Sequence, residues 1–136
     1  MIRIESIEQL EKICQQILQE CKENVCLLLS GDLGAGKTTF TKHLLKCMGV
    51  KEVVNSPTFV ILNQYQAHDL LINHMDAYRL ENNEEVELYT ENFYGAFNII
   101  EWSENLNFDY EKDFKVIKIT IKLIDEQIRE FEIEGI

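Results

Sequence analysis

The residues with the most specific chemistry are the eight of Gly31-Asp-Leu-Gly-Ala-Gly36-Lys37-Thr38. This spacing, G-x-x-x-x-G-K-[ST], is typical of a loop that binds nucleotide phosphates. Its glycines let backbone N–H groups surround an anion without Cβ clashes, while Lys37 would reach the β- and γ-phosphates and the Thr38 hydroxyl would bind magnesium. A chance match in a chain of this length has a probability of only about half a percent.

Two acidic residues that follow apolar segments are candidates to hold the metal of such a site. Asp76 follows LLINHM, an apolar run interrupted by Asn73 and His74, and Glu101 follows the more continuous FNII. Carboxylates at the ends of parallel strands lie beside the phosphate-binding loop. Either acid could instead cap a loop, so the residues alone leave the choice open.

Three other residues are weaker candidates. Thr58 in NSPTF lies next to the only proline and could sense the γ-phosphate or position water, as a switch segment does. Trp102 follows Glu101 and could pack near a nucleotide, although tryptophan is more often a core residue. The histidines are spread over different segments, and His74 is interpreted as structural, so no catalytic triad or metal cluster is readable.

The elements that position these residues can be read from hydrophobic periodicity. Ser6 is the expected N-cap of a helix over residues 7–24, whose apolar positions recur at helical spacing as far as Cys21, with Gln9 placed for a capping box. The segment 25–30, VCLLLS, predicts a strand buried on both faces, and 37–48 predicts a helix that Gly49 ends.

The second half predicts mainly strands. Residues 59–66 and 66–80 can form a hairpin that turns at 66–69, residues 82–94 a short acidic helix, and residues 97–102 a strand. Residues 115–123 and 127–135 alternate apolar and polar side chains and predict an antiparallel hairpin. The expected class is α/β, a three-layer fold like that of phosphate-loop nucleoside triphosphatases, with a mixed sheet, a parallel core and an antiparallel C-terminal hairpin.

Length and composition predict a single domain over residues 1–136 in the cytoplasm. The chain is 46% hydrophobic and 27% charged, which is enough for a core. Its four cysteines include no CxxC pair and are interpreted as reduced core thiols. No apolar run approaches the ~18–20 residues of a membrane helix, and no secretory signal is evident. The net charge of −11 argues against unaided nucleic-acid binding.

Absent features narrow the class of phosphate-loop protein. There is no Asn-Lys-x-Asp segment to read guanine, and three arginines are few for a kinase that clamps transferring phosphates. The acidic charge disfavours an ATPase that acts on DNA. A small ATPase whose hydrolysis serves a protein partner fits best, with a small nucleotide or metabolite kinase and a nucleotide-gated binding module as alternatives.

Four segments in order, GDLGAGKTT, SPTF, HMDAYRL and IIEWSE, together resemble the TsaE (YjeE) family over residues 6–134. The resemblance implies a bacterial ATPase needed for N6-threonylcarbamoyladenosine at position 37 of tRNAs that decode ANN codons. In that family the protein acts with TsaB and TsaD, and TsaD transfers the threonylcarbamoyl group, so tRNA would be contacted only indirectly. The implied cofactors are ATP and Mg²⁺.

The resemblance also implies roles for individual residues. The phosphates of ATP would be bound by the loop residues Gly34, Ala35, Gly36, Lys37, Thr38 and Thr39. Thr38 and Glu101 would be magnesium ligands, and catalysis would involve Lys37, Asp76 as an acid that orients water or supports the metal, and Thr58. Trp102 and Ser6 would lie near the nucleotide. One departure is that EEVELYTEN lacks the glycine that usually follows this helix in the family.

Overall fold

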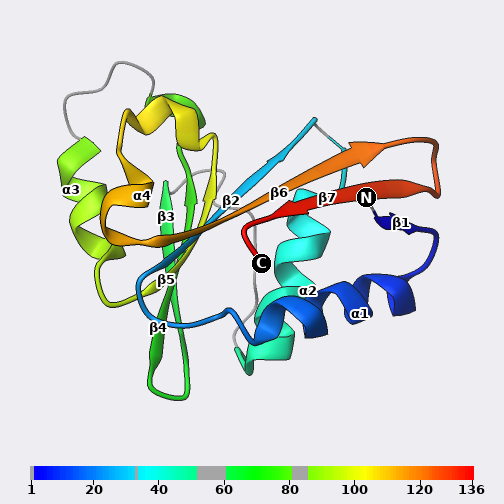
Figure 1. Cartoon of the computed structure of the whole chain (residues 1–136), viewed down its shortest axis with the longest axis horizontal. Coiled ribbons are helices and arrows are strands. Elements are labelled where there is room, and N and C mark those ends of the chain that lie inside the picture. The colour runs from blue at the N-terminus through cyan, green and yellow to red at the C-terminus, as the bar shows by residue number, and fades with distance from the viewer. Residues whose placement is uncertain (1, 33, 52–60, 81–85) are drawn as a thin grey trace.

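The strands of the protein form one mixed sheet. The computed structural model describes residues 2–32, 34–51, 61–80 and 86–136, and within them seven strands lie in the order β1-β7-β6-β2-β5-β4-β3 (Figure 1). Their bounds are β1 Ile2–Ile4, β2 Val25–Gly31, β3 Leu62–Ala67, β4 Leu70–Asp76, β5 Phe97–Glu101, β6 Lys115–Leu123 and β7 Arg129–Glu134.

The centre of the sheet is parallel and both edges are antiparallel. Strand β2 pairs in parallel with β5 and β6, and β5 pairs in parallel with β4. Strand β3 is antiparallel to β4, and β7 is antiparallel to β6. The expected parallel core and C-terminal hairpin are therefore confirmed. Strand β1, which pairs with β7, was not predicted, because three residues are too few to show a period.

Helices cover both faces of the sheet, which gives the expected three layers. Helices α1 (Ile7–Leu18) and α2 (Lys37–Met48) pack on one face, and α3 (Val86–Thr90) and α4 (Tyr110–Asp113) lie on the other with three short 3-10 turns (Figure 1). Strand β2 is buried on both sides: Leu27 faces α1 and α2, and Leu28 faces the short helices. A continuously apolar strand is what such a central position requires.

Helix α1 begins as predicted and ends earlier. The Ser6 Oγ accepts a hydrogen bond from the Gln9 N–H at 3.3 Å, as an N-cap does. The helix ends at Leu18, so the prediction that it continues through residue 24 is wrong. Cys21 lies beyond that end and donates its N–H to the Leu18 carbonyl in a turn. Ile7, one of the apolar positions at helical spacing, is 51% exposed, whereas Leu10 is 5% exposed.

The hairpin and the short helix of the second half form where the sequence predicts them, but the helix is shorter than predicted. The β3–β4 hairpin turns at His68 and Asp69, and His68 has the positive φ of 55° that such a tight turn requires. Of the helix expected over residues 82–94, Val86–Thr90 is α-helical and Glu91–Phe93 is a 3-10 turn, while residues 82–85 lie outside the described part. Helix α4 was not predicted.

Buried amide side chains tie the central strands to the short-helix layer. Asn98 of β5 accepts a hydrogen bond from Asn73 Nδ2 at 2.8 Å and donates to the Val25 and Phe93 carbonyl oxygens at 3.1 and 3.0 Å. Gln64 of β3 donates to Asn73 at 3.0 Å. Because both asparagines are fully buried, these bonds replace the water that the amides lose on folding.

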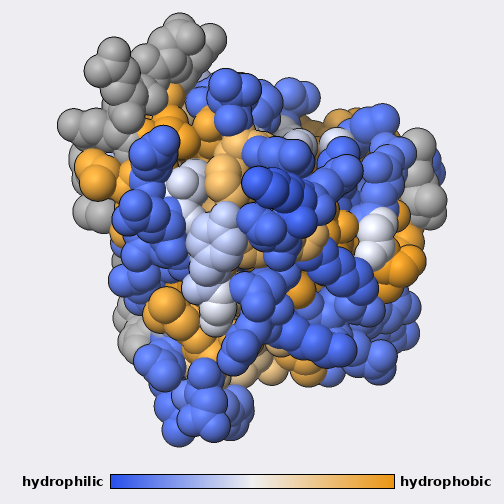
Figure 2. Space-filling model, turned by 60° about the vertical axis from the view of Figure 1, so that its left-hand side comes forward, coloured by the Kyte–Doolittle hydropathy of each residue, from blue (hydrophilic) through white to orange (hydrophobic). Residues whose placement is uncertain are grey.

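The surface is largely polar on the side of the short helices. Figure 2 shows mostly hydrophilic residues there, interrupted by separate hydrophobic ones. No helix in the described ranges is long and apolar enough to cross a membrane. All four cysteines are free thiols, as expected, but only Cys14 and Cys26 are fully buried, while Cys21 and Cys47 are partly exposed.

Candidate functional site

The glycine-rich loop connects the carboxyl end of β2 to the first residue of α2. Gly34 and Gly36 have φ angles of 82° and 106°, which side-chain-bearing residues rarely adopt. At Gly31 a Cβ would lie 2.8 Å from the Ile121 carbonyl oxygen, so the loop packs against β6 without room for a side chain. Glycine at these three positions is therefore required by the backbone itself.

The amino end of α2 is arranged to attract an anion. Gly36 is its N-cap, and no side chain of the described residues caps it. The first turn carries Lys37 and contains no acidic residue. The free N–H groups and the positive end of the helix dipole therefore face the same place as the loop amides. This is the arrangement that binds phosphate at helix N-termini.

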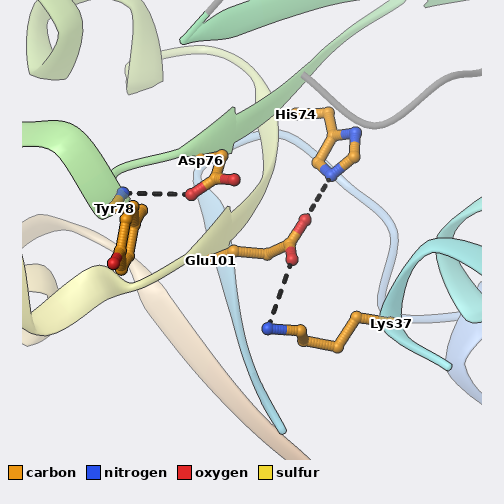
Figure 3. A network of polar contacts seen from close by, with 5 residues as sticks. All are labelled: Lys37, His74, Asp76, Tyr78 and Glu101. Atoms are coloured by element: carbon orange, nitrogen blue, oxygen red, sulfur yellow. Dashed lines mark hydrogen bonds and ion pairs between the residues drawn. The ribbon is translucent and has the colours of Figure 1, made fainter. Parts of the chain in front are cut away.

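The two candidate acids lie on neighbouring parallel strands at the same edge of the sheet. Asp76 of β4 and Glu101 of β5 are register partners. Glu101 is 5% exposed, and its Oε1 lies 3.7 Å from Lys37 Nζ (Figure 3). The structure thus brings Glu101, and not Asp76, to the lysine of the loop. The residue pattern alone leaves the choice between the two acids open, and the family resemblance implies Glu101 as the metal ligand.

Asp76 has a different environment from Glu101. Its Oδ1 accepts a hydrogen bond at 3.0 Å from the N–H of Tyr78, so it caps the turn that follows β4 (Figure 3). Its side chain is partly exposed at the edge of the site. The Asp76 carboxylate therefore has both a structural contact and access to solvent. This environment suits an acid that orients a water molecule, whereas the buried Glu101 beside the loop does not have such access.

Trp102 lies beside the loop lysine and outside the core. Its side chain is 40% exposed, and Lys37 Nζ is 5.7 Å from its ring centroid, within the range of a cation–π interaction. The ring of Tyr78 packs edge-on against it, with centroids 5.0 Å apart. Trp102 also has a positive φ of 58°, rare for such a residue, so the chain turns sharply after Glu101.

A pocket opens on the other side of the loop. It has a volume of about 210 Å³, and Ser6, Ala35, Gly36, Thr39 and Arg129 contribute to its wall. Ser6, which is distant from the loop in sequence, therefore reaches the same pocket as the loop residues. The rest of the lining is mixed: apolar side chains lie beside the polar Glu5, Glu126 and Gln127. Apolar walls with a few polar groups are the usual composition of a ligand pocket.

Two further residues belong to this region: Arg129, for which the sequence predicted no role, and His74, which was expected to be structural. Arg129 of β7 donates from Nε to the Ala35 carbonyl oxygen at 3.0 Å, and His74 of β4 lies 2.9 Å from Glu101 through Nε2. His74 interrupts the apolar run of the buried strand β4, and this polar interruption is the signal that could have identified it. Arg129 lies in the alternating, partly exposed strand β7, where a charged residue does not stand out. Thr58, the expected switch residue, lies outside the described residues.

The side chains present are suited to a magnesium ion that a nucleotide helps to hold. Mg²⁺ takes oxygen ligands and is commonly bound by one or two carboxylates together with substrate phosphates. Glu101 supplies a buried carboxylate next to the loop, and Thr38 supplies a hydroxyl in the first turn of α2. In the described ranges no group of three or more His, Cys, Asp or Glu is arranged to hold a metal ion.

Comparison with known proteins identifies relatives of this chain. The profile of the family described as "Threonylcarbamoyl adenosine biosynthesis protein TsaE" matches residues 4–131. The chain is 41% identical over 107 residues to a protein of Rickettsia conorii named "tRNA threonylcarbamoyladenosine biosynthesis protein TsaE", a match that covers 76% of this chain. A protein of the same name from Aquifex aeolicus is 34% identical over 132 residues, covering 96% of this chain and 92% of its own length.

Two of these relatives are longer than the region that this chain matches. The match spans 61% of the Rickettsia conorii protein and 61% of a Bacillus subtilis protein of the same name, which is 40% identical over 97 residues, or 71% of this chain. The crystal structure of Bacillus subtilis YdiB superposes with a TM-score of 0.70 at 30% identity, over 96% of this chain and 80% of that one. The overall fold of this chain is therefore shared with a solved structure.

Proposed function

The chain belongs to the TsaE family, and we propose that it is a Mg-ATP-dependent ATPase that supports the synthesis of N6-threonylcarbamoyladenosine at position 37 of tRNA. The observation that carries the proposal is the approach of Lys37 Nζ to Glu101 Oε1, 3.7 Å apart at the end of the glycine loop. A phosphate-loop lysine beside a buried carboxylate is the pair of charges needed to bind phosphate and its metal.

The residues around the loop divide the binding of ATP between them. The amides of the loop and of the first turn of α2 bind the phosphates, and Lys37 neutralises their charge. We assign the nucleoside to the pocket lined by Ser6, Thr39 and Arg129, because it adjoins the loop directly. Trp102 lies on the opposite side, near Lys37, where it shields the phosphates from solvent.

The hydrolytic part of the site lies at the ends of β4 and β5. The Thr38 hydroxyl and the Glu101 carboxylate would hold Mg²⁺, which when bound offsets negative charge on the phosphate oxygens. Asp76 is placed next to Glu101 in register and would orient a water molecule towards the terminal phosphate. Thr58 would contribute from the SPTF segment as a residue that responds to the phosphate.

The partners that we propose are TsaB and TsaD. The net charge of −11 disfavours direct binding to tRNA, so the chain would act on the modifying enzyme and contact tRNA only indirectly. Hydrolysis would be weak in the isolated chain and would support turnover of the TsaB–TsaD complex. Its free cysteines are consistent with a cytoplasmic location, where thiols stay reduced.

The test is ATP turnover measured with and without purified TsaB and TsaD, together with tRNA modification. We expect slow turnover alone and a changed rate with both partners. Lys37→Ala should abolish ATP binding and modification, whereas Lys42→Ala, on the exposed face of the same helix, should preserve both. The proposal fails if Lys37→Ala leaves ATP binding and tRNA modification intact, or if phosphate is transferred to a small acceptor and not to water.

A further inference from the structure

His74 is a buried polar residue of β4, the strand between β5 and the edge strand β3. Its side chain is 1% exposed, and its Nε2 lies 2.9 Å from Glu101 Oε2, while the Glu101 side chain is itself 6% exposed (Figure 3). Two polar groups so deeply buried must satisfy one another, because neither can reach water. The contact is therefore part of the folded structure and not a chance surface pairing.

The two oxygens of Glu101 have unequal partners. Oε2 is at hydrogen-bond distance from His74, whereas Oε1 is 3.7 Å from Lys37 Nζ, an ion-pair distance too long for a hydrogen bond. His74 thus fixes one oxygen, and the other faces the loop with only a loose electrostatic contact. A carboxylate held in this way cannot rotate freely, so the direction of Oε1 is set by His74.

The surroundings of the imidazole define which nitrogen donates. Among the described residues Nδ1 is buried without a hydrogen-bond partner. Nε2 faces a carboxylate, which can only accept. The neutral ring therefore carries its proton on Nε2, and Nε2–H donates to Glu101 Oε2.

We propose that His74 is a positioning residue that orients Glu101 for magnesium through the Nε2–H hydrogen bond to Oε2. It contacts neither nucleotide nor metal. A hydrogen-bond donor behind a metal-binding carboxylate fixes its orientation, and loss of such a partner commonly costs 10–100-fold in metal affinity or activity. This inference rests on the proposed function, since the ion concerned is the one that accompanies ATP.

The first test separates magnesium binding from nucleotide binding. His74→Leu removes the donor and keeps an apolar side chain, and His74→Gln retains an N–H near the position of Nε2. ATP affinity is measured by calorimetry in Mg²⁺ and in EDTA. We expect His74→Leu to lower the ratio of the two affinities by roughly 10-fold or more, with the value in EDTA unchanged. His74→Gln should recover most of the ratio. The control His68→Asn, in the turn that precedes β4, should leave the ratio unaltered.

Different outcomes of that test overturn the inference. A His74→Leu protein that loses affinity equally in Mg²⁺ and in EDTA would indicate a merely structural role. So would a folded His74→Gln protein that behaves like the leucine variant. If wild-type protein binds no ATP under either condition, the proposed function fails and not this inference. The NMR experiment described next then tests the His74–Glu101 hydrogen bond independently of ATP.

The second test uses the protein without nucleotide and does not depend on folding of the leucine variant. Nitrogen-15 NMR distinguishes the two imidazole tautomers, and with only three histidines in the chain His74 is assigned from His74→Gln. We expect the Nε2–H tautomer and a shift of its proton signal in Glu101→Gln, where the acceptor is neutral. A proton on Nδ1, or a His74 signal indifferent to Glu101→Gln, would overturn the inference.

Discussion

Arg129 and Ala35 are 94 positions apart in the sequence and share a hydrogen bond of 3.0 Å, from the guanidinium Nε to the backbone carbonyl oxygen. Arg129 lies in the last strand, and Ala35 lies in the middle of the phosphate loop. The arginine is held in turn by the carbonyl oxygen of Asp125 at 2.9 Å. The C-terminal hairpin therefore supports the loop directly, so its integrity should affect nucleotide binding.

Arg129→Ala is expected to weaken ATP binding by about 10-fold or more, because a hydrogen bond from a charged donor contributes about 1.5–3 kcal/mol and the Ala35 carbonyl would lose it. Arg129→Lys, which keeps a charge but not the fork of donors, should be intermediate. The matched control is Arg3→Ala, which removes a surface arginine that bonds Glu130 at 2.8 Å. Equal losses in Arg3→Ala and Arg129→Ala would contradict a specific role in the loop. Fluorescent-nucleotide titration provides the measurement.

Trp102 should report nucleotide binding through its fluorescence. It is the single tryptophan of the chain, is 40% exposed, and lies 5.7 Å from the ammonium group of Lys37. Movement of Lys37 towards bound phosphates would change the charge beside the indole, so emission should shift on addition of Mg-ATP. Lys37→Ala should remove the response. Saturating ATP that binds by calorimetry without altering the emission would show that Trp102 is remote from the nucleotide.

Asn98 is expected to matter for stability and not for ATP binding. Asn98→Ala would leave the carbonyl oxygens of Val25 and Phe93 and the amide of Asn73 without this partner, and buried groups left unsatisfied cost about 1–3 kcal/mol each. We expect the free energy of unfolding to fall by about 2–4 kcal/mol in urea titrations. Asn63→Ala, in the edge strand, should change it by less than about 1 kcal/mol. A loss of ATP affinity in folded Asn98→Ala protein would contradict this separation.

Two buried thiols, Cys14 and Cys26, and the partly buried Cys21 should make the protein less stable in alkaline solution. Burial raises the pKa of Cys14, Cys21 and Cys26 from 9.0 to about 12. Above pH 9 the unfolded chain loses these protons while the folded chain keeps them, so stabilisation present below pH 9 is lost as the pH rises towards 12. The free energy of unfolding should therefore fall as the pH rises from about 9 towards 12. Replacing Cys14 and Cys26 by alanine should flatten that slope, and a slope unchanged by the replacement would refute the assignment.

The parts of the fold that sequence predicted best are those decided by neighbouring residues. The residues of the glycine loop are contiguous in the sequence, so the motif can be read directly. The positive φ angles of Gly34 and Gly36 require glycine at those positions. The periodicity of α2 and the alternation of β6 and β7 are likewise local. The ends of the helices are not decided locally in the same way. Helix α1 ends at Leu18, where the chain turns, although the apolar spacing continues to Cys21.

Sequence by itself determined the phosphate loop, the α/β class and, through four ordered segments, the family, because these depend on residue types at short fixed spacings. Only the tertiary structure decided that Glu101 and not Asp76 approaches Lys37, that His74 holds Glu101, and that Arg129 reaches Ala35. Each of these contacts joins different strands or a strand and a loop. Such distances are set by strand order and register, which arise from the burial of the whole sheet and leave no mark in a local pattern.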